Sequence, residues 1–254
     1  MCTLVILRRP GHEWPVLLAA NRDEMADRSW RPPARHWPER PRVTAGLDER
    51  AGGTWLGLNT SGVAAGVLNR LHSLGPQPGH PSRGELPLKA LDHATAAAAA
   101  EAVSRIEPIS YRSFNMIIAD ASEAFWLKFP GHDSAGATTV EAAELADGLS
   151  MITAYDLNDP ASPRMRKYLP QFQAARPPDP GSGDWSSWRA LLARGDFDAG
   201  AGPGGAMCVR ADSGFGTTSS SLIALPAPQM AGVKPVWLFA AGRPGQAAWL
   251  PVPL

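Results

Sequence analysis

The chain opens with Met1-Cys2-Thr3-Leu4-Val5-Ile6-Leu7, and no other segment is as informative about its fold. The run from Thr3 is apolar and rich in β-branched residues, which is typical of a strand buried on both faces. Cys2 has a small side chain, so we expect removal of the initiator methionine and a free α-amine beside the thiol. The thiol has an ordinary pKa of about 8.5 and the amine one of about 8, so one residue can supply both a nucleophile and its base.

A second apolar run, Val16–Ala20, predicts a β-hairpin with the first. The far end of this hairpin returns Asn21-Arg22-Asp23-Glu24 to the neighbourhood of Cys2. There the cation of Arg22 can lower the thiol pKa, and Asp23 can accept hydrogen bonds from the α-amine. The alternative is an ordinary ion pair on the surface, which contributes little to stability.

Composition excludes several classes of function. The 254 residues contain 24 Lys plus Arg and 24 Asp plus Glu, so no charge excess indicates nucleic acid or an anionic membrane as a partner. The scattered His residues form no ligand pattern, and the two cysteines make no disulfide framework. No apolar stretch reaches the roughly 18 residues of a membrane span. We therefore expect a cytoplasmic protein of one domain, residues 1–254, with no metal, no cofactor and a small-molecule substrate or ligand.

The remaining pattern predicts strands, then helices, then strands again, with hairpin connections. This order favours an α+β fold with antiparallel sheets over a doubly wound parallel one. Asn69 ends one predicted strand, where its amide can donate to an oxyanion or simply bond to the backbone. We expect strands at 54–58, 63–69, 114–119, 124–129, 207–210, 218–225 and 236–240, helices at 82–93, 95–106 and 184–195, and irregular segments at 29–42, 75–81, 155–163 and 176–183. The first of these helices is expected to begin with a capping box of Ser82 and Glu85.

Six motifs occur in one order along most of the chain. They are Met1-Cys2-Thr3-Leu4-Val5-Ile6, Ala20-Asn21-Arg22-Asp23-Glu24, Gly52-Gly53-Thr54-Trp55-Leu56-Gly57, Ser82-Arg83-Gly84-Glu85-Leu86, Phe114-Asn115-Met116-Ile117-Ile118-Ala119-Asp120 and Cys208-Val209-Arg210. In combination they resemble the NRDE family, the proteins like transport and Golgi organisation protein 2. That family is similar to the N-terminal nucleophile (Ntn) hydrolases, and the resemblance implies a four-layer αββα sandwich.

The resemblance also implies roles for individual residues. Cys2 is then the nucleophile, Arg22 and Asp23 flank it, and Asn69 is an oxyanion donor. The last role comes from residues 57–69, a strand–turn–strand segment that also resembles the bile-salt and penicillin V hydrolases. The expected substrate-binding residues are Asn21, Asn158 and Arg210.

The chain departs from the family pattern in two places. Many members have Leu-Ser-Asn where this chain has Met151-Ile152-Thr153-Ala154, so Asn158 is the substitute for the missing amide. Many have Gly-Thr-Arg where this chain has Gly216-Thr217-Thr218, so Arg210 is the substitute for the missing cation.

Two functions follow from the resemblance. The first is an amidase that cleaves a non-peptide C–N bond through Cys2. The second is a non-catalytic protein that binds or traffics a ligand, with haem as the implied ligand. The sequence itself gives haem no support, because no His-Cys or Cys-Pro pair marks an axial ligand.

Overall fold

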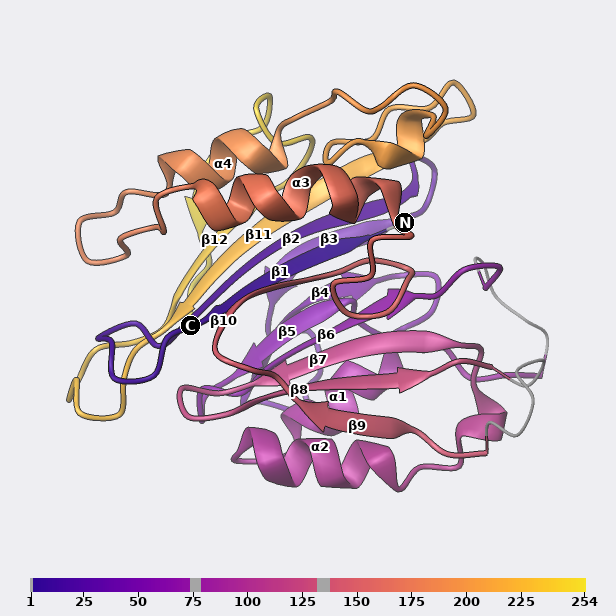
Figure 1. Cartoon of the computed structure of the whole chain (residues 1–254). Coiled ribbons are helices and arrows are strands. Elements are labelled where there is room, and N and C mark those ends of the chain that lie inside the picture. Colours follow the sequence, from indigo (N-terminus) through magenta and orange to yellow (C-terminus); the bar gives the residue numbers. More distant parts are fainter. Residues whose placement is uncertain (1, 74–78, 132–137) are drawn as a thin grey trace. The chain divides into compact units, whose positions relative to one another are not determined.

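The computed structural model describes residues 2–73, 79–131 and 138–254 (Figure 1). They form two compact units. The first contains Met1–Arg28 and Asp147–Val252, and the second contains Ser29–Ala146 with the last two residues. Each unit has one antiparallel sheet and two α-helices that pack on a face of that sheet. The predicted α+β class with antiparallel sheets is therefore confirmed.

The first unit contains a six-stranded sheet in the order β10-β1-β2-β11-β12-β13. The predicted hairpin is confirmed, because β1 and β2 pair with Thr3 opposite Asn21. The second strand of the hairpin is longer than expected and runs on to Met25, so residues 21–24 lie within a strand. The strands are β1 Thr3–Arg8, β2 Val16–Met25, β10 Gly148–Ile152, β11 Phe215–Leu225, β12 Val236–Ala240 and β13 Trp249–Pro251.

Helices α3 (Pro163–Ala174) and α4 (Ser186–Leu192) cover one face of this sheet (Figure 1). Ser162 caps α3, since its side chain accepts a hydrogen bond from the Met165 amide, and proline suits the first helical position that follows. The helices and the sheet enclose an aromatic-rich core that fixes the helix layer. Its members include Val5, Leu17, Ala19, Tyr168, Phe172, Trp185, Trp188 and Leu222.

The second unit contains a seven-stranded sheet in the order β3-β4-β5-β6-β7-β8-β9. Its core forms where helices α1 (Glu85–Leu91) and α2 (Ala96–Ser104) pack on the sheet. Its side chains include Val43, Leu86, Leu91, Val103, Phe114, Met116, Ile118 and Phe129. The strands are β3 Trp30–Ala34, β4 Val43–Asp48, β5 Leu56–Asn59, β6 Ala64–Asn69, β7 Phe114–Ala119, β8 Ala124–Phe129 and β9 Glu141–Glu144.

Several sequence predictions of local structure are wrong. The segment 29–42 is not wholly irregular, because it contains β3, which tolerates Pro32 and Pro33 at the edge of its sheet. Residues 207–210 form no strand; of these only Arg210 takes part in a bridge, an isolated one to Gly216. Helix α3, along with β4, β9, β10 and β13, was not predicted. The expected loop 75–81 lies partly outside the described residues.

The predicted capping box at the start of α1 is also wrong. Gly84 is the N-cap residue, and no side chain makes a capping hydrogen bond there. Ser82 instead accepts a hydrogen bond from the Gly84 amide at 3.1 Å. The hydroxyl therefore stabilises the turn that precedes the helix.

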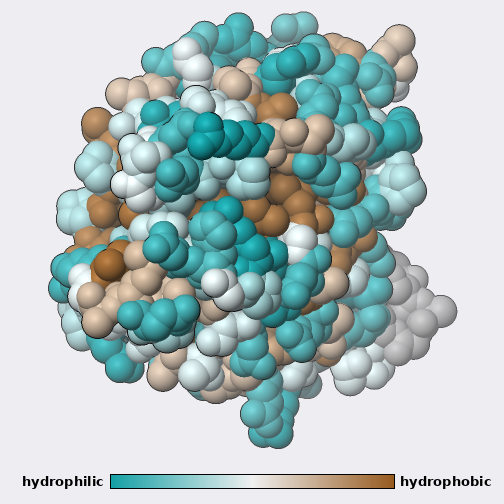
Figure 2. All heavy atoms as spheres, turned by 60° about the vertical axis from the view of Figure 1, so that its left-hand side comes forward, coloured by the Kyte–Doolittle hydropathy of each residue, from teal (hydrophilic) through white to brown (hydrophobic). Residues whose placement is uncertain are grey.

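No helix in the described part of the chain is long and apolar enough to cross a membrane. On the face shown in Figure 2, hydrophilic residues are interspersed with smaller groups of hydrophobic ones. Single exposed apolar residues of the chain include Phe197 and Leu250, and such residues are common on folded proteins.

Candidate functional site

Cys2 lies immediately before β1 in the first unit, and its side chain is half-buried. Its thiol donates a hydrogen bond to the backbone carbonyl of Asp23, with 3.7 Å between sulfur and oxygen. The pairing of Thr3 with Asn21 explains this contact, since it brings the start of β1 beside residues 22 and 23 of β2. The hairpin therefore places the thiol against the Arg22-Asp23 pair, as the sequence predicts.

Both oxygens of the Asp23 carboxylate accept hydrogen bonds within the first unit. One oxygen accepts a hydrogen bond from Arg164 at 2.9 Å, and the other accepts one from the Thr217 hydroxyl at 2.7 Å. The side chains of Asp23 and Arg164 are almost completely buried, with exposures of 0% and 3%. A buried carboxylate needs such partners, because leaving it unpaired in the interior is costly.

Arg164 was not predicted from the sequence. It occupies the first turn of α3, and its guanidinium also donates to the Thr3 hydroxyl and to the Gly204 carbonyl. One side chain thereby connects β1, β2, α3 and the 3₁₀ turn Pro203–Gly205. The sequence predicts a loop over 155–163, although Ser162-Pro163 within it is a helix-start pattern and marks where α3 begins.

Arg22 is buried beside a β-bulge. β11 contains one extra residue, Thr218, between the residues that pair with Asp23 and Arg22. Arg22 donates to the Thr218 hydroxyl at 3.1 Å, and it lies 4.0 Å from a carboxylate oxygen of Glu24. Bulges redirect side chains at the edges of functional sites. Here the bulge supplies the hydroxyl that holds the guanidinium of Arg22.

The alternation of side chains along β2 separates these residues into two groups. Asn21 and Asp23 face the helix layer, where they bond to residues of α4 and α3 respectively. Arg22 must point to the opposite face, because successive side chains of a strand alternate. Thr3 contacts Arg164 on the helix side, so the same alternation places Cys2 on the face of Arg22. The nucleophile and Arg22 therefore share one face, and the Asp23–Arg164 pair supports them from the other.

The surroundings of Cys2 raise the pKa of its thiol. Burial is the main cause, and the negative charge of Asp23 acts in the same direction. Arg22 favours the thiolate, as expected, but its effect is smaller than that of burial and Asp23. The unprocessed chain therefore holds Cys2 as a neutral thiol at pH 7, and the thiol needs a nearby base to become a nucleophile.

We expect slow alkylation of Cys2 in the unprocessed native chain at pH 7, with a reactivity that rises only above the ordinary thiol range of about 8.5. At pH values between the unfolded and the native pKa, the Cys2 thiol is protonated in the native state and ionised in the unfolded state. Stability is therefore fully retained below the unfolded pKa and falls as pH rises through the raised native one. Iodoacetamide labelling at a series of pH values, with peptide mapping and the urea-unfolded chain as control, measures this. A native midpoint below that of the unfolded chain would contradict the prediction.

Two of the expected substrate-binding residues have their side chains engaged within the chain. The amide nitrogen of Asn21 donates to the carbonyls of Leu192 and Met207 at 3.0 and 2.8 Å. Asn158 adopts a positive φ of 55°, and its side-chain oxygen accepts a hydrogen bond from the Met151 amide at 2.8 Å. The Asn21 amide therefore connects β2 to backbone that is distant in the sequence, and the Asn158 amide holds its own loop to β10. Contact of either amide with substrate stays a prediction.

Arg210 and Asn69 have no hydrogen bond to Cys2 or Asp23 among the contacts described. Arg210 is exposed and lines a pocket of the first unit together with Cys208. Asn69 ends β6 in the second unit and is half-buried, and its role as oxyanion donor stays a prediction. Among the described residues, no group of three or more His, Cys, Asp or Glu could hold a metal ion.

Comparison of the sequence with known proteins identifies one family. The sequence pattern of the family described as transport and Golgi organisation 2 matches residues 1–173. A mouse protein, a transport and Golgi organization 2 homolog, is 34% identical over 115 residues. That alignment covers 42% of this chain and 39% of the mouse protein. The chain thus spans about two fifths of the length of this curated relative.

Solved structures of three kinds of hydrolase resemble the whole chain. An N-acylethanolamine-hydrolyzing acid amidase ortholog from Caenorhabditis elegans has a TM-score of 0.56 and 12% identity, and the match covers 99% of this chain and 100% of that one. A penicillin V acylase from Agrobacterium tumefaciens has a TM-score of 0.52 and 16% identity, with 94% of this chain and 83% of that one covered. The C2A mutant of a conjugated bile acid hydrolase from Clostridium perfringens has a TM-score of 0.52 and 12% identity, with 99% and 92% covered. At these identities the likeness concerns the fold alone. It confirms the predicted Ntn-hydrolase-like fold, for which each unit supplies one sheet and its two helices.

Proposed function

This chain belongs to the transport and Golgi organisation 2 family and has the fold of an acid amidase, an acylase and a bile acid hydrolase, and we propose that it is an N-terminal cysteine amidohydrolase. The observation that carries the proposal is the position of Cys2. Its thiol lies at the start of a central strand, on the same face as Arg22 and in contact with the backbone of Asp23. The proposed substrate is a small molecule with a non-peptide amide bond, cleaved after Met1 has been removed.

The proposed reaction has two stages. The α-amine of Cys2 takes the thiol proton, and the sulfur attacks the amide carbon to give a tetrahedral oxyanion. The resulting ammonium protonates the leaving nitrogen, the C–N bond breaks, and an acyl thioester remains on Cys2. The amine then takes a proton from water, which attacks the thioester, and the carboxylic acid leaves as the thiol is restored. Asn69 is the proposed donor to the oxyanion.

Because the thiol pKa is raised in the unprocessed chain, the proposed nucleophile needs the α-amine that removal of Met1 exposes. Removal of Met1 places a positive charge on the same residue as the sulfur, and a cation at that distance favours the thiolate. In this proposal the Asp23 carboxylate, which Arg164 and Thr217 hold in place, attracts the ammonium and orients it. The paired carboxylate therefore orients the base, while Arg22 stabilises negative charge on the sulfur.

Hydrolysis should depend on the Cys2 thiol. We expect Cys2→Ala to reduce amide hydrolysis by at least about 10³-fold, because the nucleophile is lost, while the melting temperature stays near that of wild type. The probes are an N-acylethanolamine, penicillin V and a conjugated bile acid, with release of the free acid measured by mass spectrometry. If wild-type protein shown by intact mass to lack Met1 hydrolyses a probe and Cys2→Ala hydrolyses it equally well, the proposed nucleophile is wrong.

A second variant separates the amine from the thiol. A chain extended at its N-terminus keeps the thiol of Cys2 but has no free α-amine there, so we expect it to lose hydrolysis as well. Retained activity in this chain would refute the role of the amine as base. Saturable binding of haemin by a processed chain that hydrolyses no amide would instead favour the carrier function.

A further inference from the structure

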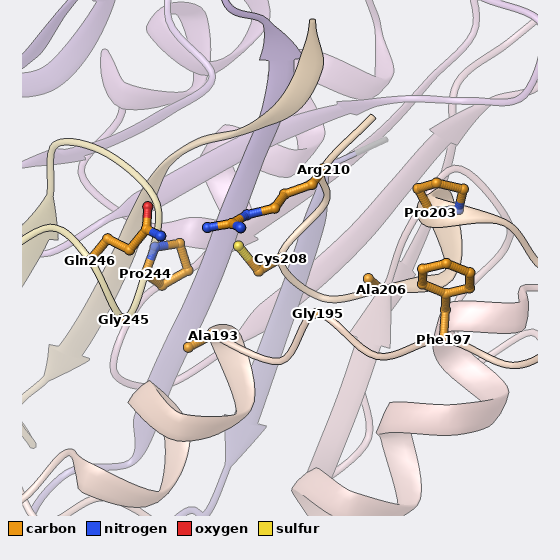
Figure 3. A pocket seen from close by; sticks show the side chains of 10 residues that line it. All are labelled: Ala193, Gly195, Phe197, Pro203, Ala206, Cys208, Arg210, Pro244, Gly245 and Gln246. Atoms are coloured by element: carbon orange, nitrogen blue, oxygen red, sulfur yellow. The ribbon is translucent and has the colours of Figure 1, made fainter. Parts of the chain in front are cut away.

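The first unit contains a pocket of about 420 Å³ whose lining residues do not include Cys2. It lies between the segment that follows α4, the residues around Cys208, and the loop at residues 244–246 (Figure 3). Figure 3 shows the side chains of Cys208 and Arg210 pointing into the same space, with Pro244 and Gln246 on one side and Phe197 and Pro203 on the other. Small-molecule sites typically have volumes of about 300–1,000 Å³, so the pocket is large enough for one.

The lining combines one positive charge with apolar walls. Arg210 is the charged lining residue, and among the described residues that line the pocket none is a carboxylate. Phe197 is 42% exposed and forms one wall. Gln246 adds an amide, and Ala193 contributes only a methyl group on the α4 side. The pocket therefore suits a ligand with an anionic end and an apolar body.

One aspartate and two arginines act on the Cys208 thiol in the wall of the pocket. Asp23 is near enough to act on the Cys208 thiol, but its carboxylate is already paired with Arg164. Arg210 and Arg243 both lie close enough to that thiol to favour its charged form. Of these two arginines Arg210 lines the pocket, and an arginine side chain is well suited to bind a carboxylate or sulfonate.

We propose that this pocket is a binding site for a small amphiphilic anion, a carboxylate or sulfonate in which Arg210 holds the charged group and Phe197 packs on the apolar body. The proposal does not depend on hydrolysis at Cys2, since Cys2 and all of β1 lie outside the lining. Cys208 lies 6% exposed in the wall, so its thiol reports whether the pocket is filled.

The first test uses 8-anilinonaphthalene-1-sulfonate, a fluorescent aromatic anion, titrated into the full chain. We expect saturable binding, and Arg210→Gln should raise its Kd at least about tenfold, because a charge-assisted contact is lost. Arg176→Gln is the matched control, since Arg176 is an exposed arginine of the same unit outside the lining, and its Kd should equal that of wild type. N-Phenyl-1-naphthylamine has the same rings without the sulfonate. It should bind more weakly, and its Kd should be the same for wild type and Arg210→Gln.

The second test locates the probe. Saturating 8-anilinonaphthalene-1-sulfonate should slow alkylation of Cys208 several-fold at pH 8.5 in wild type but not in Arg210→Gln, as followed by peptide mapping. The proposal is overturned if the probe does not bind at millimolar concentration, if Arg210→Gln and Arg176→Gln bind equally well, or if Cys208 is labelled at the same rate with and without the probe. Loss of hydrolysis in Cys2→Ala with unchanged probe binding would separate this pocket from the proposed reaction.

Discussion

Replacing Arg164 by alanine is expected to lower the free energy of unfolding by about 3–5 kcal/mol, the cost of removing one partner from a buried ion pair. The variant removes the charged partner of the buried Asp23 carboxylate, and it also removes the donors to Thr3 and Gly204. Urea denaturation followed by tryptophan fluorescence measures the loss, since Trp188 of α4 and Trp185 at its N-cap are buried in the core of the first unit.

Two further variants of α3 make this prediction sharper. Arg166→Ala removes an exposed arginine from the same helix, whose guanidinium bonds only to the Pro160 carbonyl among the contacts described, so its cost should stay below about 0.5 kcal/mol. Arg164→Lys keeps the charge but not the planar fork that serves three acceptors, so we expect an intermediate loss. A change of less than 1 kcal/mol in Arg164→Ala would show that Asp23 does not need this partner.

The local residues were enough to predict the hairpin that carries the site. The apolar runs of β1 and β2 predict two strands that pair as a hairpin, and the register of that pairing places Cys2 beside Asp23. The sequence predicts correctly that Arg22 lowers the thiol pKa. It does not predict the net rise of that pKa, because burial has a larger effect than Arg22 does. Burial depends on the packing of the whole unit, and no short stretch of sequence contains that information.

The partners of Asp23 could not be predicted, because they are distant in sequence. Arg164 lies 141 residues from Asp23, and Thr217 lies 194 residues from it. Both depend on long-range placement, one by a helix with prolines in it and the other by a bulged strand. Asn158, the expected substitute for a family amide, is another example. An asparagine side chain is suited to contact a substrate, but Asn158 has a positive φ and its side chain accepts a hydrogen bond from Met151 of β10.

Two motifs that the family resemblance relies on meet in the second unit. Gly53 belongs to the Gly-Gly-Thr-Trp motif, and Gly84 belongs to Ser-Arg-Gly-Glu. Their backbones touch, since the Thr54 amide donates to the Gly84 carbonyl at 2.9 Å. A Cβ on Gly53 would lie 2.5 Å from the Gly84 carbonyl carbon and 2.6 Å from its oxygen. Close backbone packing at the start of α1 therefore requires glycine at position 53, while a Cβ on Gly84 would lie 3.1 Å from the Thr54 nitrogen.

Gly53→Ala is accordingly expected to destabilise the protein by about 3 kcal/mol, at the upper end of the usual cost of overpacking, because the clashing atoms are backbone and no rotamer change relieves them. Gly52→Ala is the matched control. Gly52 has a positive φ of 70° but nothing within 4 Å of a Cβ, so its substitution adds only backbone strain of about 1–2 kcal/mol. Chemical denaturation of both variants measures the difference. If Gly52→Ala proved the more damaging of the two, the close contact between the motifs would not be what requires glycine at position 53.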